Sequence, residues 1–236
     1  MFTDTAELYD LFYAWKDYAG EAARVREIVE ARAPHARRLL DVACGTGRHL
    51  EHLAAWYEVE GVDLDEGLLE VARRKLPAVR FERADMRELD LGRTFDVVTC
   101  LFSSIGYVQS PEAMRSGIAA MARHVAPGGL LIVEPWLTPS TFDPAFPGRV
   151  VVVERPGLTG VRLNDSRVEG RLSIMTFHYL IGRPSAPVEH LVETHTLGLF
   201  TDDEYRDAFE AANLTAEHDP DGLMGRGLWI GTVRRR

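Results

Sequence analysis

Residues 39–47, LLDVACGTG, constrain the fold of this chain most, because they join an apolar strand to a loop with two glycines. In an open α/β sheet, the first turn from strand to helix usually carries glycines, and ligands bind beside it at the carboxyl ends of the strands. Gly45 and Gly47 allow close approach of a ligand and permit a positive φ. The run therefore predicts a cofactor site at this turn.

The glycine loop departs from the dinucleotide fingerprint. After Gly45 and Gly47, the position of the third glycine is held by Leu50. Without that glycine the loop favours adenosine with an amino-acid tail over a pyrophosphate. Asp41, just before the loop, supplies a carboxylate that can accept hydrogen bonds from the ammonium group of such a tail. An NAD-linked dehydrogenase is therefore disfavoured.

Acidic residues also end the next two predicted strands. Asp63 follows Asp41 by 22 residues, close to the roughly 20-residue interval at which a carboxylate meets ribose hydroxyls in such folds. Asp85 follows the third strand and could take the adenine amino group, while Met86 could pack on the ring. The alternative is that each carboxylate caps the helix after it. All three together favour cofactor binding.

Alternating helical and strand patterns predict a Rossmann-like, doubly wound α/β fold with a seven-stranded sheet. The helices are expected over residues 21–32, 48–56, 66–75, 111–125 and 201–212, with a capping box at 201–204. A turn is expected at Pro127-Gly128-Gly129. The strands are expected over residues 38–42, 59–62, 79–83, 95–101, 130–134, 215–218 and 228–233.

A different pattern begins after the fifth of these strands. Residues 150–154, 160–167, 172–180 and 189–199 predict antiparallel strands. We interpret residues 1–236 as a single domain whose core is 1–138 and 200–236. Residues 139–199 form a small β insertion that covers the substrate site or builds a homodimer interface.

Composition excludes several classes of protein. The net charge of −9 argues against a nucleic-acid partner, which needs many Lys and Arg contacts to phosphates. No apolar stretch approaches the roughly 20 residues that span a bilayer, and the N-terminus lacks a basic segment leading into an apolar one. We therefore expect a soluble, cytoplasmic protein without a membrane partner. Two cysteines without a second pair predict no metal.

The glycine loop and several further motifs resemble those of a known protein family. With residues 40–47 the chain resembles class I S-adenosylmethionine-dependent methyltransferases. Residues 7–11, 16–18, 102–107, 134–136 and 225–228 (ELYDL, KDY, FSSIGY, EPW and GRGL) resemble N,N-dimethyltransferases that act on nucleotide-linked amino sugars in desosamine and mycaminose biosynthesis. The resemblance covers essentially the whole chain. It implies S-adenosyl-L-methionine as cofactor, S-adenosyl-L-homocysteine as product, and a thymidine diphosphate (TDP)-linked amino sugar as substrate, methylated once or twice.

The resemblance and the residue chemistry together define a set of site residues. Tyr107 is the catalytic candidate, since it could orient the amine or relay its proton; packing in the pocket is its alternative role. The expected cofactor-binding residues are Tyr9, Tyr18, Asp41, Ala43, Gly45, Gly47, Asp63, Leu64, Asp85, Met86, Phe102 and Ser103. The expected substrate-binding residues are Tyr13, Ser104, Tyr107, Trp136, Arg149, Arg167 and Arg226, with Arg162 as a further arginine of the insertion.

The tyrosines of the N-terminal segment have two interpretations. Tyr9, Tyr13 and Tyr18 could cover the site with rings that contact the sulfonium. Alternatively Tyr9 and Tyr13, four residues apart, share the core-facing side of a helix. Arg226, between two glycines, is the candidate for the substrate diphosphate.

The chain departs from its relatives where the substrate should bind. Leu137 follows Trp136, where the family that the chain resembles has a second aromatic residue. Residues 183–187 do not match the pattern of that family, and Leu223-Met224 replaces smaller residues. The alternative function is therefore methylation of another small acceptor, such as an amino acid, an amine or a phenolic natural product. A scaffold protein that retains the fold without catalysis is a third class.

Overall fold

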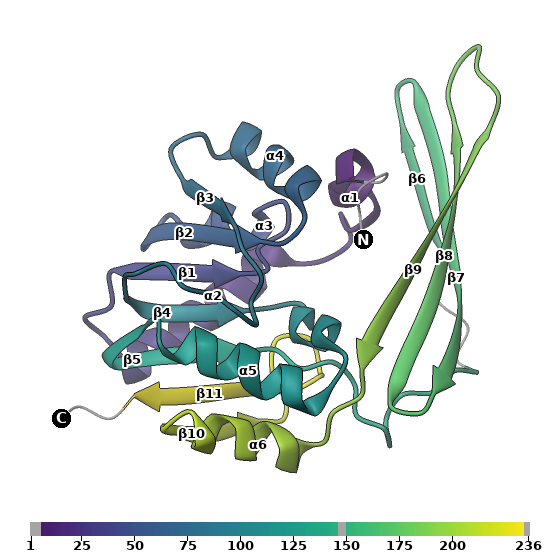
Figure 1. Ribbon diagram of the computed structural model, residues 1–236. Coiled ribbons are helices and arrows are strands. Elements are labelled where there is room, and N and C mark those ends of the chain that lie inside the picture. The colour runs from purple at the N-terminus through teal and green to yellow at the C-terminus, as the bar shows by residue number, and fades with distance from the viewer. Residues whose placement is uncertain (1–5, 146–149, 234–236) are drawn as a thin grey trace.

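The protein is described by a computed structural model over residues 6–145 and 150–233. Within these ranges it contains a seven-stranded sheet with helices on both faces and a separate four-stranded antiparallel sheet. The antiparallel sheet stands beside the edge at which the parallel strands of the large sheet end, and α1 (Ala6–Phe12) lies between the two (Figure 1).

The large sheet has the strand order β10-β11-β5-β4-β1-β2-β3. Strands β1 to β5 run parallel, β11 is antiparallel to β5, and β10 is antiparallel to β11. The direction of winding reverses between β1 and β4. The doubly wound, seven-stranded prediction is therefore confirmed. The strands are β1 (Arg38–Val42), β2 (Glu58–Asp63), β3 (Arg80–Arg83), β4 (Phe95–Cys100), β5 (Val125–Val133), β10 (Leu214–Asp219) and β11 (Leu228–Val233).

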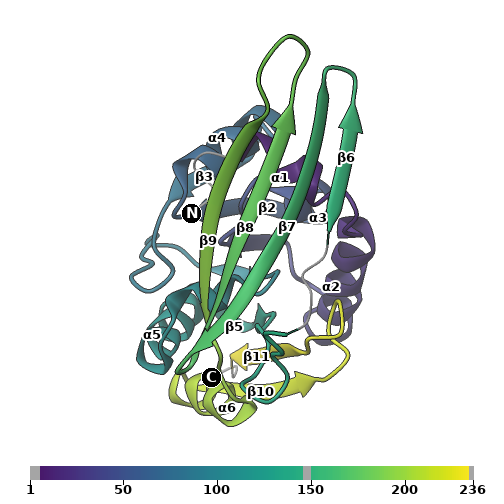
Figure 2. The same ribbon diagram turned by 90° about the vertical axis from the view of Figure 1, so that its right-hand side faces the viewer.

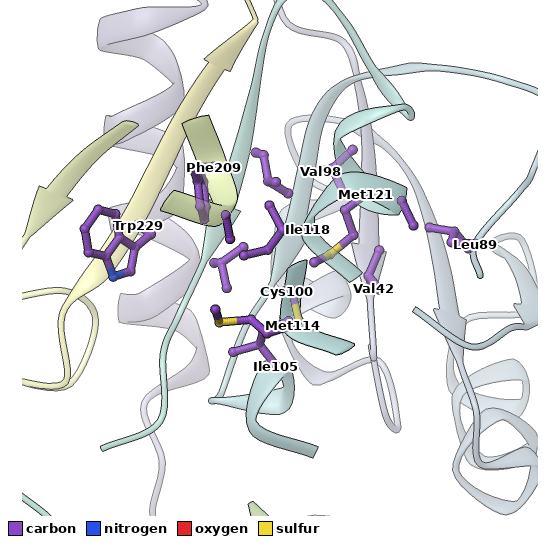
Figure 3. Close-up of a cluster of buried hydrophobic side chains, with 14 of the residues drawn as sticks. Val42, Leu89, Val98, Cys100, Ile105, Met114, Ile118, Met121, Phe209 and Trp229 are labelled. Carbon is purple, nitrogen blue, oxygen red and sulfur yellow. The ribbon is translucent and has the colours of Figure 1, made fainter. Parts of the chain in front are cut away.

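Two apolar clusters hold the helices on the sheet. One cluster joins the sheet to α2 (Tyr18–Arg32), α3 (Arg48–Leu53) and α4 (Glu66–Lys75). The other joins the opposite face to α5 (Pro111–Ala122) and α6 (Asp202–Ala211), and Figure 3 shows Ile118, Met121 and Phe209 converging there on the sheet. Because successive strand residues point to opposite faces, Leu39 packs in the first cluster and Leu40 in the second.

The prediction of a helix to Val125 followed by a turn at Pro127-Gly128-Gly129 was wrong. Helix α5 ends at Ala122, and β5 begins at Val125. Val125 pairs with Phe95, and the next pair joins Val97 to Leu130, so the proline and glycines form a bulge within the strand. Gly128 has a φ of 80° there, a conformation that favours glycine.

Helix α3 is shorter than the sequence predicts. It ends at Leu53, while the expected end was Trp56, because backbone turns follow at Ala55 and Trp56 before β2 begins. The capping box at the start of α6 is confirmed: the Thr201 side chain accepts from the Glu204 backbone, and the Glu204 side chain accepts from the Thr201 backbone.

The antiparallel sheet has the order β6-β7-β8-β9 and is made of β6 (Val151–Arg155), β7 (Leu158–Glu169), β8 (Leu172–Gly182) and β9 (Glu189–Gly198). The predicted antiparallel strands after the fifth core strand are thus confirmed, with β7 and β8 slightly longer than expected. Figure 2 shows this sheet in front of the carboxyl ends of the core strands. The division into core and insertion as units stays a prediction.

Membrane insertion by a helix finds no support in the described ranges, where no helix is long and apolar enough to cross a bilayer. The expected cytoplasmic location is not tested by this finding and stays a prediction.

Candidate active site

A cavity of about 670 Å³ is lined by residues from the carboxyl ends of the core strands and from the antiparallel sheet. This volume suits a ligand of cofactor size. The predicted site residues that line it are Tyr9, Tyr13, Ala43, Gly45, Asp63, Leu64, Asp85, Met86, Phe102, Ser103, Ser104, Tyr107, Trp136 and Arg226.

The remaining predicted residues lie elsewhere or border the cavity. Tyr18 and Asp41 line a smaller cleft that shares Tyr9 and Gly45 with the main cavity. Gly47 directly precedes α3 and is absent from both linings. Arg149 lies outside the described residues.

The glycine loop has the backbone that the sequence predicts. Ala43, Gly45 and Gly47 have positive φ values of 58°, 56° and 76°. A Cβ at Gly45 would meet nothing within 4 Å, so this position opens on the cavity. A Cβ at Gly47 would lie 3.3 Å from Leu76 Cδ1, so Gly47 serves the packing of α3 against its neighbours. The two glycines therefore have different tasks.

Asp63 supports the glycine loop while it lines the cavity. Its Oδ2 accepts from the Gly45 backbone N–H at 2.8 Å, and its Oδ1 accepts from the Asp65 N–H at 2.9 Å. A carboxylate has about four acceptor sites, so acceptor capacity remains for a ligand. Burial raises the pKa of the Asp63 carboxyl above its ordinary value.

Asp41 is the most deeply buried of the three carboxyls. It accepts from Thr99 Oγ1 at 2.7 Å and is 1% exposed. Burial raises the pKa of Asp41 to about 7, and the nearby Asp63 carboxylate adds to the shift. A cationic ligand group beside Asp41 would favour its ionised form.

Asp85 has a more open environment. Its carboxylate is bound by the Arg87 guanidinium and accepts from the Arg87 backbone N–H at 2.9 Å. The hydrogen bonds from Arg87 hold the pKa of Asp85 below its usual range. Asp85 lines the cavity as an anion with its neighbour Met86.

Helix capping does not account for these three carboxylates. The residue before α3 is Gly47, and the residue before α4 is Asp65, which caps that helix by accepting from the Leu68 N–H. Asp85 precedes no helix, because the chain runs from β3 directly to β4. Asp41, Asp63 and Asp85 are therefore not helix caps. Asp65, two positions after Asp63, is the cap that the sequence had left unassigned.

The loop after β4 is held in an unusual conformation by the segment after β5. Phe102 and Ser103 have left-handed φ values of 52° and 61°, which cost free energy for residues with a side chain. The Phe102 N–H donates to Glu134 Oε2 at 2.6 Å, and Ser103 Oγ donates to the Pro135 carbonyl at 2.7 Å. The EPW motif thus fixes the loop that borders the cavity.

Arg226 enters the same corner from the segment before β11. Its Nη1 donates to Ser103 Oγ at 2.9 Å, and its guanidinium lies 4.8 Å from the centre of the Trp136 ring. Burial lowers the pKa of Arg226, which remains a cation at neutral pH. Trp136 Nε1 in turn donates to Ser173 Oγ at 2.8 Å on β8.

The tyrosines of the N-terminal segment lie in two places. Tyr9 and Tyr13 pack ring against ring at 4.5 Å, and Tyr13 meets Phe102 edge-on at 5.4 Å. Both line the cavity and also join a small apolar cluster with α4. Tyr18 packs on His49 instead, at 4.9 Å between ring centres.

Two arginines of the insertion, Arg162 and Arg167, lie on opposite faces of the antiparallel sheet. Arg162 and Arg167 are five residues apart on β7, so their side chains leave opposite faces of the sheet. Arg162 lines the cavity, 4% exposed, with its guanidinium 4.5 Å from the Tyr13 ring centre. Arg167 is exposed and pairs with Glu169 at 2.8 Å. The structure therefore brings Arg162 to the site and leaves Arg167 outside it.

Sequence reasoning missed the remaining residues of the inner face. They share the face of Arg162, because every second residue of a strand points to the same side of the sheet. This period of two is the sequence signal that could have identified them. Those that line the cavity are Asn164, Ser166, Met175, Phe177 and Leu197. His195 and Glu193 lie behind this lining on β9 and were also missed.

Metal ligands form no group in the described ranges, where no three His, Cys, Asp or Glu side chains gather in a way that could hold an ion. The expected absence of a metal stays a prediction.

A glycine loop with acidic strand ends, at the winding reversal of this sheet, defines a class I methyltransferase. Residues 39–129 match the model of the family described as "Methyltransferase domain". The chain is 42% identical, over 97% of both chains, to dTDP-3-amino-3,4,6-trideoxy-alpha-D-glucopyranose N,N-dimethyltransferase of Streptomyces venezuelae. It is 42% identical to dTDP-3-amino-3,6-dideoxy-alpha-D-glucopyranose N,N-dimethyltransferase of Streptomyces fradiae, over 97% of this chain and 90% of that one. The chain belongs to this family of amino-sugar N,N-dimethyltransferases and is a methyltransferase.

Solved structures give the same assignment. The chain matches DesVI of Streptomyces venezuelae with a TM-score of 0.92 and 41% identity, over 97% of this chain and 98% of that one. It matches the sugar N-methyltransferase KedS8 of Streptoalloteichus with a TM-score of 0.90 and 43% identity, over 97% and 93%. The predicted resemblance is confirmed. The chain also matches the amino pentose methyltransferase CalS10, whose structure contains bound S-adenosylmethionine, with a TM-score of 0.87 and 39% identity over 95% of this chain and 96% of that one.

Proposed function

We propose that this protein transfers a methyl group from S-adenosylmethionine to the amino group of a TDP-linked amino deoxysugar. The observation that carries the proposal is that one cavity joins the Gly45 and Asp63 corner to the Arg226 and Trp136 corner, with Tyr107 on its wall. One corner suits the cofactor and the other suits an anionic nucleotide, so the two reactants would meet in one cavity.

The residues of the first corner fit the cofactor. Gly45 leaves space for a ligand against the backbone. Asp63 retains acceptor capacity for the two ribose hydroxyls after its two backbone bonds. Asp85 and Met86 would meet the adenine, and Asp41 would favour the ammonium of the amino-acid tail. Tyr9 and Tyr13 would shield the sulfonium with their rings.

The second corner fits a nucleotide-linked substrate. Arg226 is a partly buried cation, and its planar guanidinium can bind a diphosphate with two hydrogen bonds. Trp136 offers an aromatic face beside it. Arg162 adds a second positive charge to the lining. These features support a dianionic substrate over a neutral amino acid or phenol.

Positioning dominates the chemistry that the protein must supply. S-adenosylmethionine brings an activated methyl group, so the reaction is an in-line displacement that needs a neutral amine at the correct distance. Holding both reactants in alignment can remove roughly 7 to 11 kcal/mol of barrier at the upper end. The antiparallel sheet supports this by closing one side of the cavity and limiting water.

Mass spectrometry of products tests the proposal. The protein is incubated with S-adenosylmethionine and a panel of TDP-linked 3-amino and 4-amino deoxysugars, with free amines, amino acids and phenols as controls. We expect a gain of one and then two methyl masses on a TDP-linked sugar. Methylation of a control class with none on any nucleotide-linked sugar would replace this proposal by the alternative acceptor. In a thermal-shift titration, TDP should stabilise the protein more than inorganic phosphate does.

We also propose that two copies associate through the outer face of the antiparallel sheet. Strand pairing puts Val152 in one row with Leu180, and Leu163 in the next row with Val192. All four are exposed, between 43% and 60%, and lie on one face, with His178 between Leu163 and Val192. Exposed apolar side chains gathered on one face mark association sites. Light scattering should give the mass of a dimer, and Leu163→Lys together with Val192→Lys should give that of a monomer. A monomeric wild-type protein would exclude the proposal.

A further inference from the structure

Tyr107 is the first of three side chains that form a chain behind the cavity wall. Its hydroxyl lies 2.8 Å from His195 Nδ1, and His195 Nε2 lies 3.6 Å from Glu193 Oε2. The first contact is a hydrogen bond, while the second has the length of an ion pair. His195 is 1% exposed and Glu193 is 7% exposed, so solvent screens these interactions little.

The fold brings these residues together from distant parts of the chain. Tyr107 lies in η1 (Ser104–Val108), a short 3-10 helix after β4. Glu193 and His195 are two apart on β9, so both side chains leave the same face of the sheet. Gly106 allows η1 to pack closely on β9, because a Cβ there would lie 2.9 Å from Leu197 Cδ2 and 3.2 Å from Trp136 Cβ.

The chain also orients the Tyr107 hydroxyl. A carboxylate near Nε2 favours the tautomer of His195 that carries its proton on Nε2. Nδ1 is then an acceptor, and the Tyr107 O–H donates to it. This leaves the oxygen of Tyr107 as an acceptor toward the cavity that it lines. The group that an acceptor there would select is an N–H donor, such as an amine or an ammonium.

We infer that Glu193 and His195 are positioning residues that act through Tyr107 to remove a proton from the substrate amine before each methyl transfer. The inference rests on the proposed function, because it requires an amine in the cavity. The N–H bond of the ammonium breaks and an O–H bond forms on Tyr107, while the original Tyr107 proton passes to His195 Nδ1. The resulting imidazolium is stabilised by the Glu193 carboxylate, and its proton returns through Tyr107 to water when the site opens.

The concerted transfer matters because ionised Tyr107 is unfavourable. Burial raises the pKa of Tyr107 well above its ordinary value, and the surrounding acidic groups add to this shift. Tyr107 therefore passes a proton on without becoming an anion. The titratable or charged groups that face this chain come from each neighbouring element and are Tyr13 after α1, Asp63 on β2, Arg162 on β7, Tyr179 on β8 and Glu193 on β9.

The test is the pH dependence of kcat for His195→Gln, Glu193→Gln and Tyr107→Phe, with the amino-sugar acceptor found for the wild type. Glutamine at 195 can still accept from Tyr107 but cannot take a proton. We expect kcat of His195→Gln to fall about 100-fold at pH values where the substrate is an ammonium, with KM within about twofold. The deficit should shrink as pH rises, because the substrate then supplies its own neutral amine. Glu193→Gln should show a smaller loss of the same shape.

A double variant separates a relay from independent effects. Residues that act as one unit are non-additive, so Tyr107→Phe combined with His195→Gln should be no slower than the slower single variant. His35→Gln, at an exposed histidine in the turn between α2 and β1, away from the carboxyl ends of the strands, is the matched control and should keep wild-type kcat. Unchanged thermal unfolding and unchanged affinity for S-adenosylhomocysteine would establish that each variant is folded.

Three results would overturn the relay: full activity of His195→Gln at every pH, a loss of equal size at every pH, or additive losses in the double variant. Each can occur while the wild type methylates its acceptor, so the proposed function would stand. A wild type that methylates no amine at all would overturn the proposed function and the relay with it.

Discussion

Arg226 Nη1 and Ser103 Oγ form a 2.9 Å hydrogen bond across 123 positions of sequence. Ser103 Oγ in turn donates to the Pro135 carbonyl. These two hydrogen bonds join three segments at one corner of the cavity: the loop after β4, the loop after β5 and the loop before β11. The guanidinium at this corner donates to a neutral hydroxyl and lies over the Trp136 ring, and the carboxylates of Glu134 and Glu21 favour its charged form. A guanidinium has five N–H donors, so donors remain for an anionic ligand.

Replacing Arg226 should weaken substrate binding far more than cofactor binding. Hydrogen bonds to a charged partner contribute roughly 1.5 to 3 kcal/mol, so we expect Arg226→Met to raise KM for the nucleotide sugar about 30-fold. Arg226→Lys should recover part of this loss, because it keeps the charge without the planar fork. Steady-state kinetics measures both variants. Arg167→Met, on the other face of β7, is the control and should leave KM unchanged.

Much of this site could be predicted from the sequence, because parallel strands align their carboxyl ends at one edge. Asp63 and Asp85 could thus be placed near Gly45 by strand order alone. Arg162 and Arg167 could not be separated in the same way. Their faces depend on the register of an antiparallel sheet, and a shift of one residue exchanges the two.

The bulge in β5 and the contact of Tyr107 with His195 could not be predicted from the sequence for a related reason. Pro127 and two glycines are typical of a turn, yet tertiary pairing with β4 keeps them in a strand. His195 meets Tyr107 only because η1 packs on β9. Contacts between elements far apart in sequence carry no local pattern.

Asp63→Ala should reduce affinity for S-adenosylhomocysteine and also destabilise the protein. The substitution removes the acceptor of two backbone N–H groups, at Gly45 and Asp65. The Asp65 donor is buried, and such a donor left without a partner costs about 1 to 3 kcal/mol. Asp63→Asn retains part of this acceptor capacity and should lose less stability. Calorimetric titration and chemical denaturation measure the two effects. Wild-type affinity in both variants would remove Asp63 from the cofactor site.

Asp41 should make stability depend on pH. Its pKa is about 7 in the folded protein and about 3.9 in an unfolded chain. Because the folded value is raised, its contribution is fully present below about pH 3.9 and is lost as pH rises through about 7, by at most about 1.4 kcal/mol per pH unit. Asp41→Asn mimics the protonated form, so its advantage over wild type should grow between those pH values. Urea denaturation without cofactor measures it, and parallel pH profiles would contradict the assignment.

Gly106 should be intolerant of even one added methyl group. In Gly106→Ala the new Cβ would lie 2.9 Å from Leu197 Cδ2 and 3.2 Å from Trp136 Cβ, so η1 must move away from β9. We expect a cost of about 1 to 3 kcal/mol in the free energy of unfolding, together with a fall in kcat as Tyr107 separates from His195.

Gly117→Ala provides the matched control for that change. Gly117 lies inside α5, and its added Cβ would make ordinary contacts at 3.7 Å. Because alanine favours a helix over glycine, this variant should be stabilised by about 0.5 to 1 kcal/mol and should keep wild-type kcat. Thermal unfolding and steady-state kinetics compare the pair. If Gly106→Ala kept full kcat and lost only stability, the close packing of η1 on β9 would serve the fold alone and would not align Tyr107 for catalysis.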